Sequence, residues 1–560
     1  MSQSRIVPGK GLEVNLGQAI GAAFGESSSL VAVLVVAMFL AAGVAGFRAY
    51  RRPYALVTRP ASTGVDLELV PPVPESRTML QLERALLFAL GGYLFFDRAF
   101  AWLHIPGLPL FVGELVIILG IVAMLSTNMR LGGIIRRSGA FKALLGYMVW
   151  GALLLVGRIT VYGQDAIRDA ALWYYGIIAI FVIVLLNSRP DRITRWVRLF
   201  GRAVPYFLIW FPIATVIDAL FDEVLPVVPD STIPISAHRT GNMAVMAAAG
   251  LGFLWLVDRD SEMYSERQRV GLTALATIVL LFAGMKNRGG FVAAALALAI
   301  AAIFLRRKRS EISMVMVGAV VVLLTIGLLG NVRIALFSDG REVSVDQLLN
   351  NLTSVIDQDA GGSRQTSTTA WRLQIWADVL RDVTSEFPLT GFGPGPDLGE
   401  RYGIEGIEAE PLRNPHNSHV GVLARSGFVG AGLWARMFVI WTVELLLARG
   451  RMLARGKKLE AGIVVWLIVT VVAILVNAIF DPTLEGPQVA WWLWAMLGFG
   501  ISLTVKLLGP RDSTSYVNDS DSLVWNGLRS SEPNIDAATW RTSSTIAWPI
   551  SSASSRVWIP

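Results

Sequence analysis

The sequence predicts an all-α protein, a polytopic bundle of transmembrane helices with about 12 core spans, one further N-terminal span and a long extracytoplasmic loop containing short helices. Two observations predict this fold. Of the 560 residues, 54% are hydrophobic and 16% charged, whereas soluble domains carry about 25% charged residues. The apolar residues also form blocks of about 16 to 20, long enough for a helix to cross a bilayer core of roughly 30 Å. Lipid offers no hydrogen-bond partners, so these segments must be helices.

The hydrophobic blocks give the individual spans. They lie at 30–47, 84–103, 108–126, 141–156, 170–187, 203–221, 241–257, 270–285, 290–305, 312–330, 419–447, 461–480 and 488–508. Lys and Arg gather in alternate loops, at 48–59, 130–142, 189–202, 259–269, 306–309 and 449–458. Such cations mark the cytoplasmic side. We therefore expect the N-terminus outside and the C-terminus inside, with Trp491, Trp492 and Trp494 in an outer interfacial belt.

The spans divide the chain into five expected parts. These are an N-terminal accessory span with a linker (1–83), the first part of the transmembrane core (84–330), an extracytoplasmic loop (331–418), the last core spans (419–510) and a disordered cytoplasmic tail (511–560). The long loop exceeds usual connection lengths, which marks it as functional or as a small domain. Helical spacing predicts one amphipathic helix in it, at the membrane surface or over a cavity, carrying Arg372, Ile375, Trp376, Val379, Leu380 and Val383.

Composition and local pattern exclude several kinds of site. The chain has no cysteine, which excludes disulfides, thiolate metal sites and a cysteine nucleophile. The basic residues behind its net charge of +7 lie between the spans, as membrane topology requires. We therefore expect membrane lipids and no nucleic acid as partners. Residues 391–395 (GFGPG) lack the strand, helix start and lysine of a phosphate-binding loop and predict a turn.

Three short segments stand out at the predicted outer face. Residues 238–242 (HRTGN) open one span, residues 286–290 (KNRGG) form a short turn between two spans, and residues 414–419 (NPHNSH) close the long loop. Arginine presents a planar fork of donors, so Arg239 and Arg288 suit the oxygens of a lipid diphosphate. A histidine can take a proton from a sugar hydroxyl near neutral pH.

The same residues also have ordinary structural interpretations. An interfacial arginine taken alone is more often a snorkelling anchor than a ligand. A single histidine beside a proline turn is more often a surface residue or a cap. Residue chemistry by itself therefore leaves the function open.

The segment after the long loop resembles the signature of the O-antigen ligase and polymerase superfamily. His416 and Asn417 are followed by nine residues and then Gly427, which is the spacing of that signature. Further similar parts are Arg372, Trp376, residues 387–393 (FPLTGFG), Arg239 with Gly241 and Asn242, and the turn 287–290, which has Asn where the family has Ser. The resemblance covers about residues 84–508.

This resemblance implies a metal-independent glycosyltransferase of the bacterial inner membrane that needs no cofactor. It implies a donor glycan on undecaprenyl diphosphate and a glycan, lipid or protein acceptor, joined at the outer face in cell-envelope or exopolysaccharide biosynthesis. Carried over, His416 would be the catalytic base, and Arg239 and Arg288 would bind the diphosphate. Possible additional site residues are Arg372, Asn417 and His419.

Three alternatives remain at this stage. Some polymerases of the group carry an arginine with a glycine eleven positions later in each of two outer loops. Arg239 and Gly250 have this spacing but no arginine from 364 to 425 does, so we favour ligation over joining of repeat units. A transporter or flippase of lipid-linked sugars would predict repeated halves, discontinuous helices and charges near the midplane. A non-catalytic scaffold would predict no convergence of Arg239, Arg288 and His416.

Overall fold

The computed structural model describes residues 76–105, 110–126, 132–221, 224–229, 231–305, 363–403 and 413–507, and this part of the chain is all-helical, as predicted. Its helices are α3 (Arg77–Ala101), α4 (Val112–Leu125), α5 (Gly132–Arg137), α6 (Gly139–Val156), α7 (Ile159–Tyr162), α8 (Gln164–Asp169), α9 (Ala171–Tyr174), α10 (Ile177–Ser188), α11 (Asp191–Phe221), α12 (Thr240–Leu256), α13 (Asp258–Ser261), α14 (Glu266–Lys286), α15 (Arg288–Phe304), α18 (Ser363–Glu386), α19 (Leu398–Arg401), α20 (Ser418–Ala454), α21 (Lys458–Phe480) and α22 (Pro487–Leu507).

Each predicted span that falls on described residues coincides with a helix or a helix pair. Seven of the described helices are long and apolar enough to cross a membrane, and α8–α9 together with α10, bent by 41° at their junction, reach the same length and apolarity as a pair. Three predicted spans correspond to the shorter apolar helices α4, α12 and α15. The predicted spans 30–47 and 312–330 and the tail 511–560 lie outside the described residues. The chain is a multi-pass membrane protein, and its number of crossings stays a prediction.

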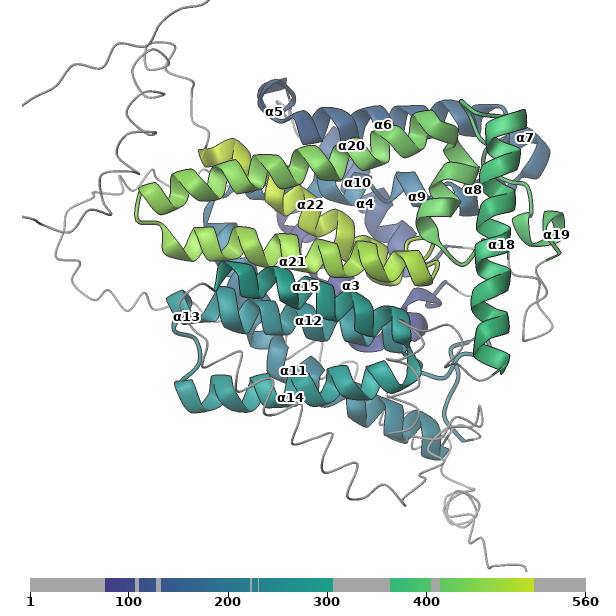
Figure 1. Cartoon of the computed structure of the whole chain (residues 1–560). Helices are drawn as coiled ribbons and strands as arrows, with labels where there is room; N and C mark the ends of the chain where they lie inside the picture. Colours follow the sequence, from purple (N-terminus) through teal and green to yellow (C-terminus); the bar gives the residue numbers. More distant parts are fainter. Residues whose placement is uncertain are drawn as a thin grey trace, which may run out of the picture. The chain divides into compact units, whose positions relative to one another are not determined.

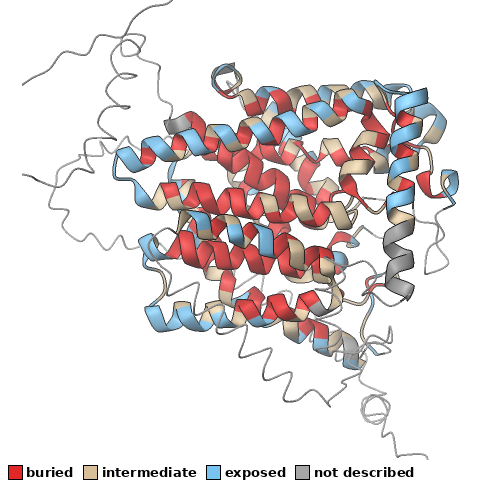
Figure 2. Cartoon of the chain, viewed as in Figure 1, coloured by how far each residue is buried: buried red, intermediate tan, exposed pale blue. Residues whose placement is uncertain are grey.

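Helices α12, α21 and α22 form the buried centre of the described bundle, and the other helices pack around them (Figures 1 and 2). Every residue of α12 from Gly241 to Leu256 is buried, and this helix contacts α14, α15 and α21. Its sequence, like that of α15, is rich in Ala and Gly, and such small side chains let helix backbones approach closely in a membrane. The outward faces of α14, α18 and α20 carry many exposed positions (Figure 2).

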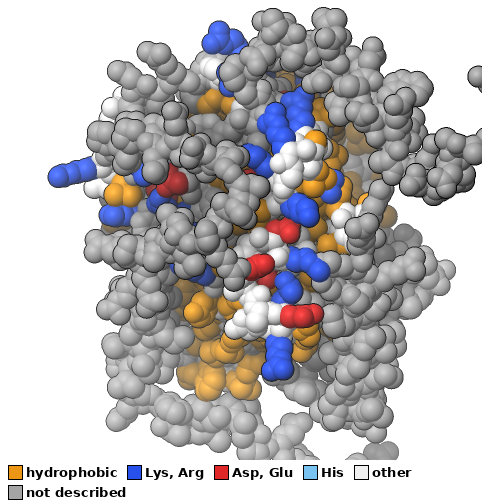
Figure 3. Space-filling view, turned by 90° about the vertical axis from the view of Figure 1, so that its left-hand side faces the viewer, with side chains coloured by type: hydrophobic (Ala, Val, Ile, Leu, Met, Phe, Trp, Pro, Cys, Tyr) orange, Lys and Arg blue, Asp and Glu red, His pale blue; other side chains and the backbone are white. Residues whose placement is uncertain are grey.

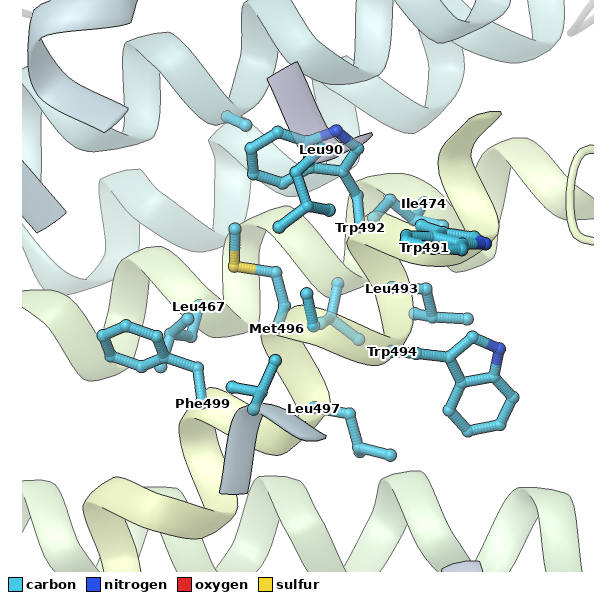
Figure 4. Close-up of a cluster of buried hydrophobic side chains, with 14 of the residues drawn as sticks. Leu90, Leu467, Ile474, Trp491, Trp492, Leu493, Trp494, Met496, Leu497 and Phe499 are labelled. Atoms are coloured by element: carbon cyan, nitrogen blue, oxygen red, sulfur yellow. The ribbon is translucent and has the colours of Figure 1, made fainter. Parts of the chain in front are cut away.

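The tryptophans at the start of α22 correct one prediction. Trp491, Trp492 and Trp494 are buried inside the bundle rather than placed in a lipid-facing belt (Figure 4). The Trp491 ring lies 5.3 Å from that of Tyr93, and the Trp494 ring lies 5.7 Å from that of Trp434. The prediction is wrong because α22 packs against α3, α10, α20 and α21, so that protein rather than lipid surrounds these tryptophans.

Basic side chains gather at the end of the bundle where α20 ends and α21 begins (Figure 3). The exposed cations there include Arg451, Arg455, Lys457 and Lys458, which belong to one of the predicted cytoplasmic groups. The opposite end is crossed by α18 (Figure 1). The helix bundle therefore has one strongly basic end and, at the other end, the segments singled out by the sequence.

Arg192, in the predicted basic loop 189–202, is buried. Its side chain is 1% exposed, and its Nε donates to the Glu83 carboxylate at 2.8 Å. Trp196 donates its indole N–H to the same carboxylate at 2.9 Å. Arg192 is therefore part of a buried polar junction between α3 and α11, and its charge is more than a topological signal.

The amphipathic helix predicted in the long loop is α18. Its apolar stripe, Ile375, Val379 and Val383, is buried against a cluster that includes Phe392 and Ala424. Leu380 was predicted on this face, but it is 48% exposed. The buried stripe follows four-residue spacing, and Leu380 lies one position beyond it, on a different side of the helix.

Candidate functional site

The turn that carries His416 is built by two flanking asparagines. Asn414 accepts the His416 backbone N–H at 3.1 Å. Asn417 is the N-cap of α20, and its side-chain oxygen accepts the backbone N–H groups of His419 and Val420. His416 itself has a φ of 53°, a conformation that non-glycine residues adopt rarely and that clusters at functional sites. The Asn417 of the sequence signature is thus a helix cap that supports the turn presenting His416.

Helix α18 holds this turn from the outside. The indole N–H of Trp376 donates to the backbone carbonyl of Pro415 at 2.8 Å. The Trp371 ring meets the His416 ring edge to face, with centroids 5.8 Å apart. Because the apolar stripe of α18 is anchored on α20 and the segment before it, these contacts fix His416 relative to the bundle.

The glycine of the signature interrupts α20. Gly427 has φ 63° and ψ −169°, so α20 has a break at this residue. A side chain there would collide with the backbone of Leu389, since an added Cβ would lie 2.4 Å from its carbonyl. The Phe428 N–H instead donates to Pro388, and the Phe392 N–H donates to Ala424. The spacing from His416 to Gly427 therefore reflects the length of the first segment of α20, which runs from Ser418 to the break at Gly427.

The glycine-rich run 391–395 is a turn, as predicted. Its three glycines have positive φ angles, and buried charges hold it in place. Arg425 pairs with Asp169 at 2.9 Å and donates to the Pro396 carbonyl. Asp169 also accepts the Gly395 N–H at 2.8 Å. Arg413 closes the group by donating to the Gly395 carbonyl.

The first turns of α12 and α15 meet through glycine. Arg239 is the N-cap of α12, and Arg288 is the first residue of α15. A Cβ on Gly290 would lie 2.7 Å from the Cα of Gly241, and one on Gly289 would lie 2.3 Å from Phe480. The glycines after each arginine therefore let α12, α15 and the end of α21 approach one another, which brings the two arginine-bearing segments together.

The end of α21 adds a carboxylate that sequence reasoning missed. Asp481 is the C-cap of α21, and its Oδ1 lies 3.2 Å from Nη1 of Arg239. Beside it, Arg372 from α18 donates to the Phe480 carbonyl at 3.1 Å. The sequence did contain a signal for it: Asp481 is an acidic residue at the end of a predicted span, at the same predicted outer face as segments 238–242, 286–290 and 414–419.

Charge–charge effects tie these residues into one cluster. Burial and the positive charges of Arg372 and Arg239 lower the pKa of His416 to about 4, against an opposing effect of Asp481. Burial lowers the pKa of Arg372, which Asp481 raises and Arg288 lowers further. Arg372 and Arg239 therefore lie within electrostatic range of His416, and Arg288 lies within range of Arg372. The three guanidinium groups suit an anion with more than one charge.

Two other histidines have different surroundings. His419 uses both ring nitrogens inside the bundle, since Nε2 contacts the Leu475 carbonyl at 2.8 Å and Nδ1 accepts from Trp434 at 3.2 Å. It was a possible additional site residue, and its contacts favour a structural role. His238 donates from Nδ1 to the Ser236 carbonyl at 2.7 Å.

Gly250, which shares the arginine–glycine spacing of some polymerases, lies within α12. There an added Cβ would sit 3.1 Å from the Phe207 ring. It is a packing position of a buried helix rather than part of an outer loop.

Among the described residues, no group of three or more His, Asp and Glu side chains is arranged to hold a metal ion.

Comparison with known proteins gives one match, to part of the chain. A search of curated proteins found no match to the chain. Residues 272–435 match the family model described as O-antigen ligase, a stretch that contains Arg288, Arg372, His416 and Gly427. Arg239 and Asp481 lie outside the matched stretch and join the cluster through the packing of α12 and α21. The described part of the chain is that of a multi-pass membrane protein, and its residues 272–435 are similar to the O-antigen ligase family.

Proposed function

We propose that this protein is a membrane glycosyltransferase that ligates an oligosaccharide or polysaccharide from undecaprenyl diphosphate onto an acceptor hydroxyl. The reaction takes place at the outer face of the bacterial inner membrane, in cell-envelope or exopolysaccharide biosynthesis. The acceptor is a glycan, a lipid or a protein. One observation carries this proposal: His416, three arginines and Asp481 form one charged cluster at the end of the helix bundle crossed by α18.

The arginines would bind the donor. Arg239, Arg288 and Arg372 offer forked donors to the diphosphate oxygens, and the diphosphate would compete with Asp481 for Arg239. Their positive charge stabilises the leaving group as its bond to the sugar breaks. Because the cluster lies at the ends of the helices, it suits a phosphate group at headgroup depth with its lipid tail in the bilayer.

His416 would act as the general base. Its pKa of about 4 keeps the imidazole unprotonated at neutral pH, as a proton acceptor must be. The imidazole removes the proton of the acceptor hydroxyl, the hydroxyl oxygen bonds to the anomeric carbon, and the bond from that carbon to the diphosphate oxygen breaks. The bound diphosphate offsets the field of Arg239 and Arg372 and so raises the pKa of His416, which makes it a stronger base when donor is present.

The rival interpretation is transport of the same lipid-linked sugars. It predicts discontinuous helices, and α3 and α20 are indeed interrupted, at Asp97 and Gly427. The interruption at Asp97 supports the charged cluster, because Asp97 binds the backbone of Arg239. The interruption at Gly427 lets the backbone of Leu389 approach α20. Both breaks therefore have a local packing role that does not require an alternating pathway.

A reconstituted transfer assay tests the proposal. The purified chain in liposomes receives a glycan on undecaprenyl diphosphate together with a lipid, glycan or protein acceptor. Ligation predicts one transferred glycan per acceptor and release of undecaprenyl diphosphate, read by mass spectrometry. A ladder of lengthening lipid-linked glycans without acceptor would identify a polymerase. Movement of intact donor across the bilayer without bond cleavage would establish transport and contradict the proposal.

A further inference from the structure

Asp97 occupies a break in the first helix of the described bundle. It has φ 38° and ψ −107° inside α3, and it is 3% exposed. A non-glycine residue in this conformation is strained, and such strain persists only where the surroundings hold the residue firmly. A buried carboxylate also requires hydrogen-bond partners. Both features indicate that the position of this side chain matters more than the regularity of α3.

The partners of the Asp97 carboxylate belong to the first turn of α12. One oxygen accepts the backbone N–H of Arg239 at 2.6 Å, and the other accepts the side-chain amide of Asn242 at 2.8 Å. Arg239 is the N-cap of α12 but provides no capping hydrogen bond from its own side chain. A carboxylate from another helix therefore supplies an acceptor at the positive end of α12, where negative charge is favourable.

Arg239 is consequently held at two points by two acids. Asp97 fixes its backbone, and Asp481 pairs with its guanidinium at 3.2 Å. In the proposed reaction the diphosphate takes over the guanidinium from Asp481, so the contact with Asp97 is the one that remains throughout. We propose that Asp97 is a positioning residue, which aims Arg239 at the donor diphosphate by holding the first turn of α12. This inference rests on the proposed function.

A proton relay through Asp97 is the competing interpretation. His238 is close enough to act electrostatically on the Asp97 carboxylate, and its Nε2 is buried without a hydrogen-bond partner among the described residues. A relay needs an ionisable group at residue 97, whereas positioning needs only hydrogen-bond acceptance. The substitution Asp97→Asn separates the two. The oxygen of the new side chain can accept from Arg239, and Asn242 can rotate its amide so that its oxygen, which has no partner in the described chain, accepts from the new amide group.

The test compares Asp97→Ala, Asp97→Asn and the control Glu83→Gln in the full-length protein. Glu83 is also a buried carboxylate of α3 that accepts from side chains of another helix, Arg192 and Trp196, but it lies toward the other end of α3. We expect Asp97→Ala to raise the KM for the lipid-linked donor about tenfold or more, with a smaller effect on kcat. Asp97→Asn should stay near the wild-type value, and Glu83→Gln should leave KM unchanged while lowering the melting temperature. An Asp97→Asn variant as impaired as Asp97→Ala, or an unchanged KM in Asp97→Ala, would overturn the proposal.

Hydrogen exchange gives a readout that does not depend on transfer. Amides 239–243 should exchange faster in Asp97→Ala than in wild type, and at the wild-type rate in Glu83→Gln. Unchanged exchange in Asp97→Ala would overturn the positioning role whether or not the protein transfers glycans. Absence of transfer by the wild-type protein, together with faster exchange in Asp97→Ala, would instead reject the proposed function and keep Asp97 as the residue that orders Arg239.

Discussion

The indole N–H of Trp376 donates to the backbone carbonyl of Pro415 at 2.8 Å, which ties α18 to the residue just before His416. The strained backbone of His416 costs on the order of 1–3 kcal/mol, so the turn needs such external support. Helix α18 is in turn seated on α20 by its buried apolar stripe. The helix from the long loop and the turn of the signature therefore form one unit.

We predict that Trp376→Phe reduces transfer about fivefold to tenfold, because it keeps the ring but removes the hydrogen bond, worth about 1 kcal/mol or more. Leu380→Ala is the matched control on the same helix, since Leu380 is 48% exposed, and it should retain wild-type rates. The measurement is the initial rate of transfer in liposomes. Equal rates in Trp376→Phe and wild type would show that α18 does not support the turn.

Gly427→Ala should destabilise the protein by about 3 kcal/mol or more, because it adds backbone strain and a collision with Leu389. Gly432→Ala tests the same change further along α20, where an added Cβ meets nothing within 4 Å. There we expect a neutral or slightly stabilising effect. Thermal unfolding in detergent compares the two variants. Similar melting temperatures for both would contradict the proposed role of the break.

Arg288→Lys should lower kcat/KM for the donor at least tenfold although it keeps the charge, because an ammonium cannot reproduce the bidentate fork. Arg381→Lys is the control on α18, where the arginine side chain is 70% exposed, and it should have no effect. The measurement is kcat/KM over a range of donor concentrations. An Arg288→Lys enzyme with wild-type kinetics would remove Arg288 from the diphosphate site.

The pH dependence of transfer follows from the lowered pKa of His416. Only the unprotonated imidazole can accept a proton, and kcat/KM reports the ionisation of the donor-free enzyme. We therefore expect kcat/KM to hold its value down to about pH 4. For an exposed histidine it would fall near pH 6.5. The acidic limb of the kcat profile should lie at higher pH, because bound diphosphate raises the pKa of His416. A kcat/KM limb at or above 6.5 would contradict the described surroundings of His416.

The spans and the main site segments could be predicted from sequence because both depend on local pattern. A bilayer imposes apolar blocks of helical length, and the arginines and His416 stand in short segments at helix ends. Helix α18 was predictable from its apolar spacing. Leu380 was misplaced because spacing gives the width of an apolar face only approximately.

Contacts between distant segments could not be predicted in this way. Asp97 binds Arg239 from 142 positions away, and nothing in the sequence around either residue specifies this partner. Asp481 and the pair of Arg425 with Asp169 likewise depend on which helices pack together. The buried tryptophans of α22 were misassigned for the same reason, since the sequence does not say whether an aromatic turn faces lipid or protein.

The most direct test of the account is the rate of glycan transfer by His416→Ala, with His419→Ala as its matched control. Both variants are measured in liposomes with a glycan on undecaprenyl diphosphate, per amount of folded protein. We predict that His416→Ala loses about 10²-fold to 10⁴-fold in rate while still binding the donor, and that His419→Ala keeps its turnover with a lower melting temperature. Wild-type transfer by His416→Ala would contradict the assignment of the base and, with it, the proposed mechanism.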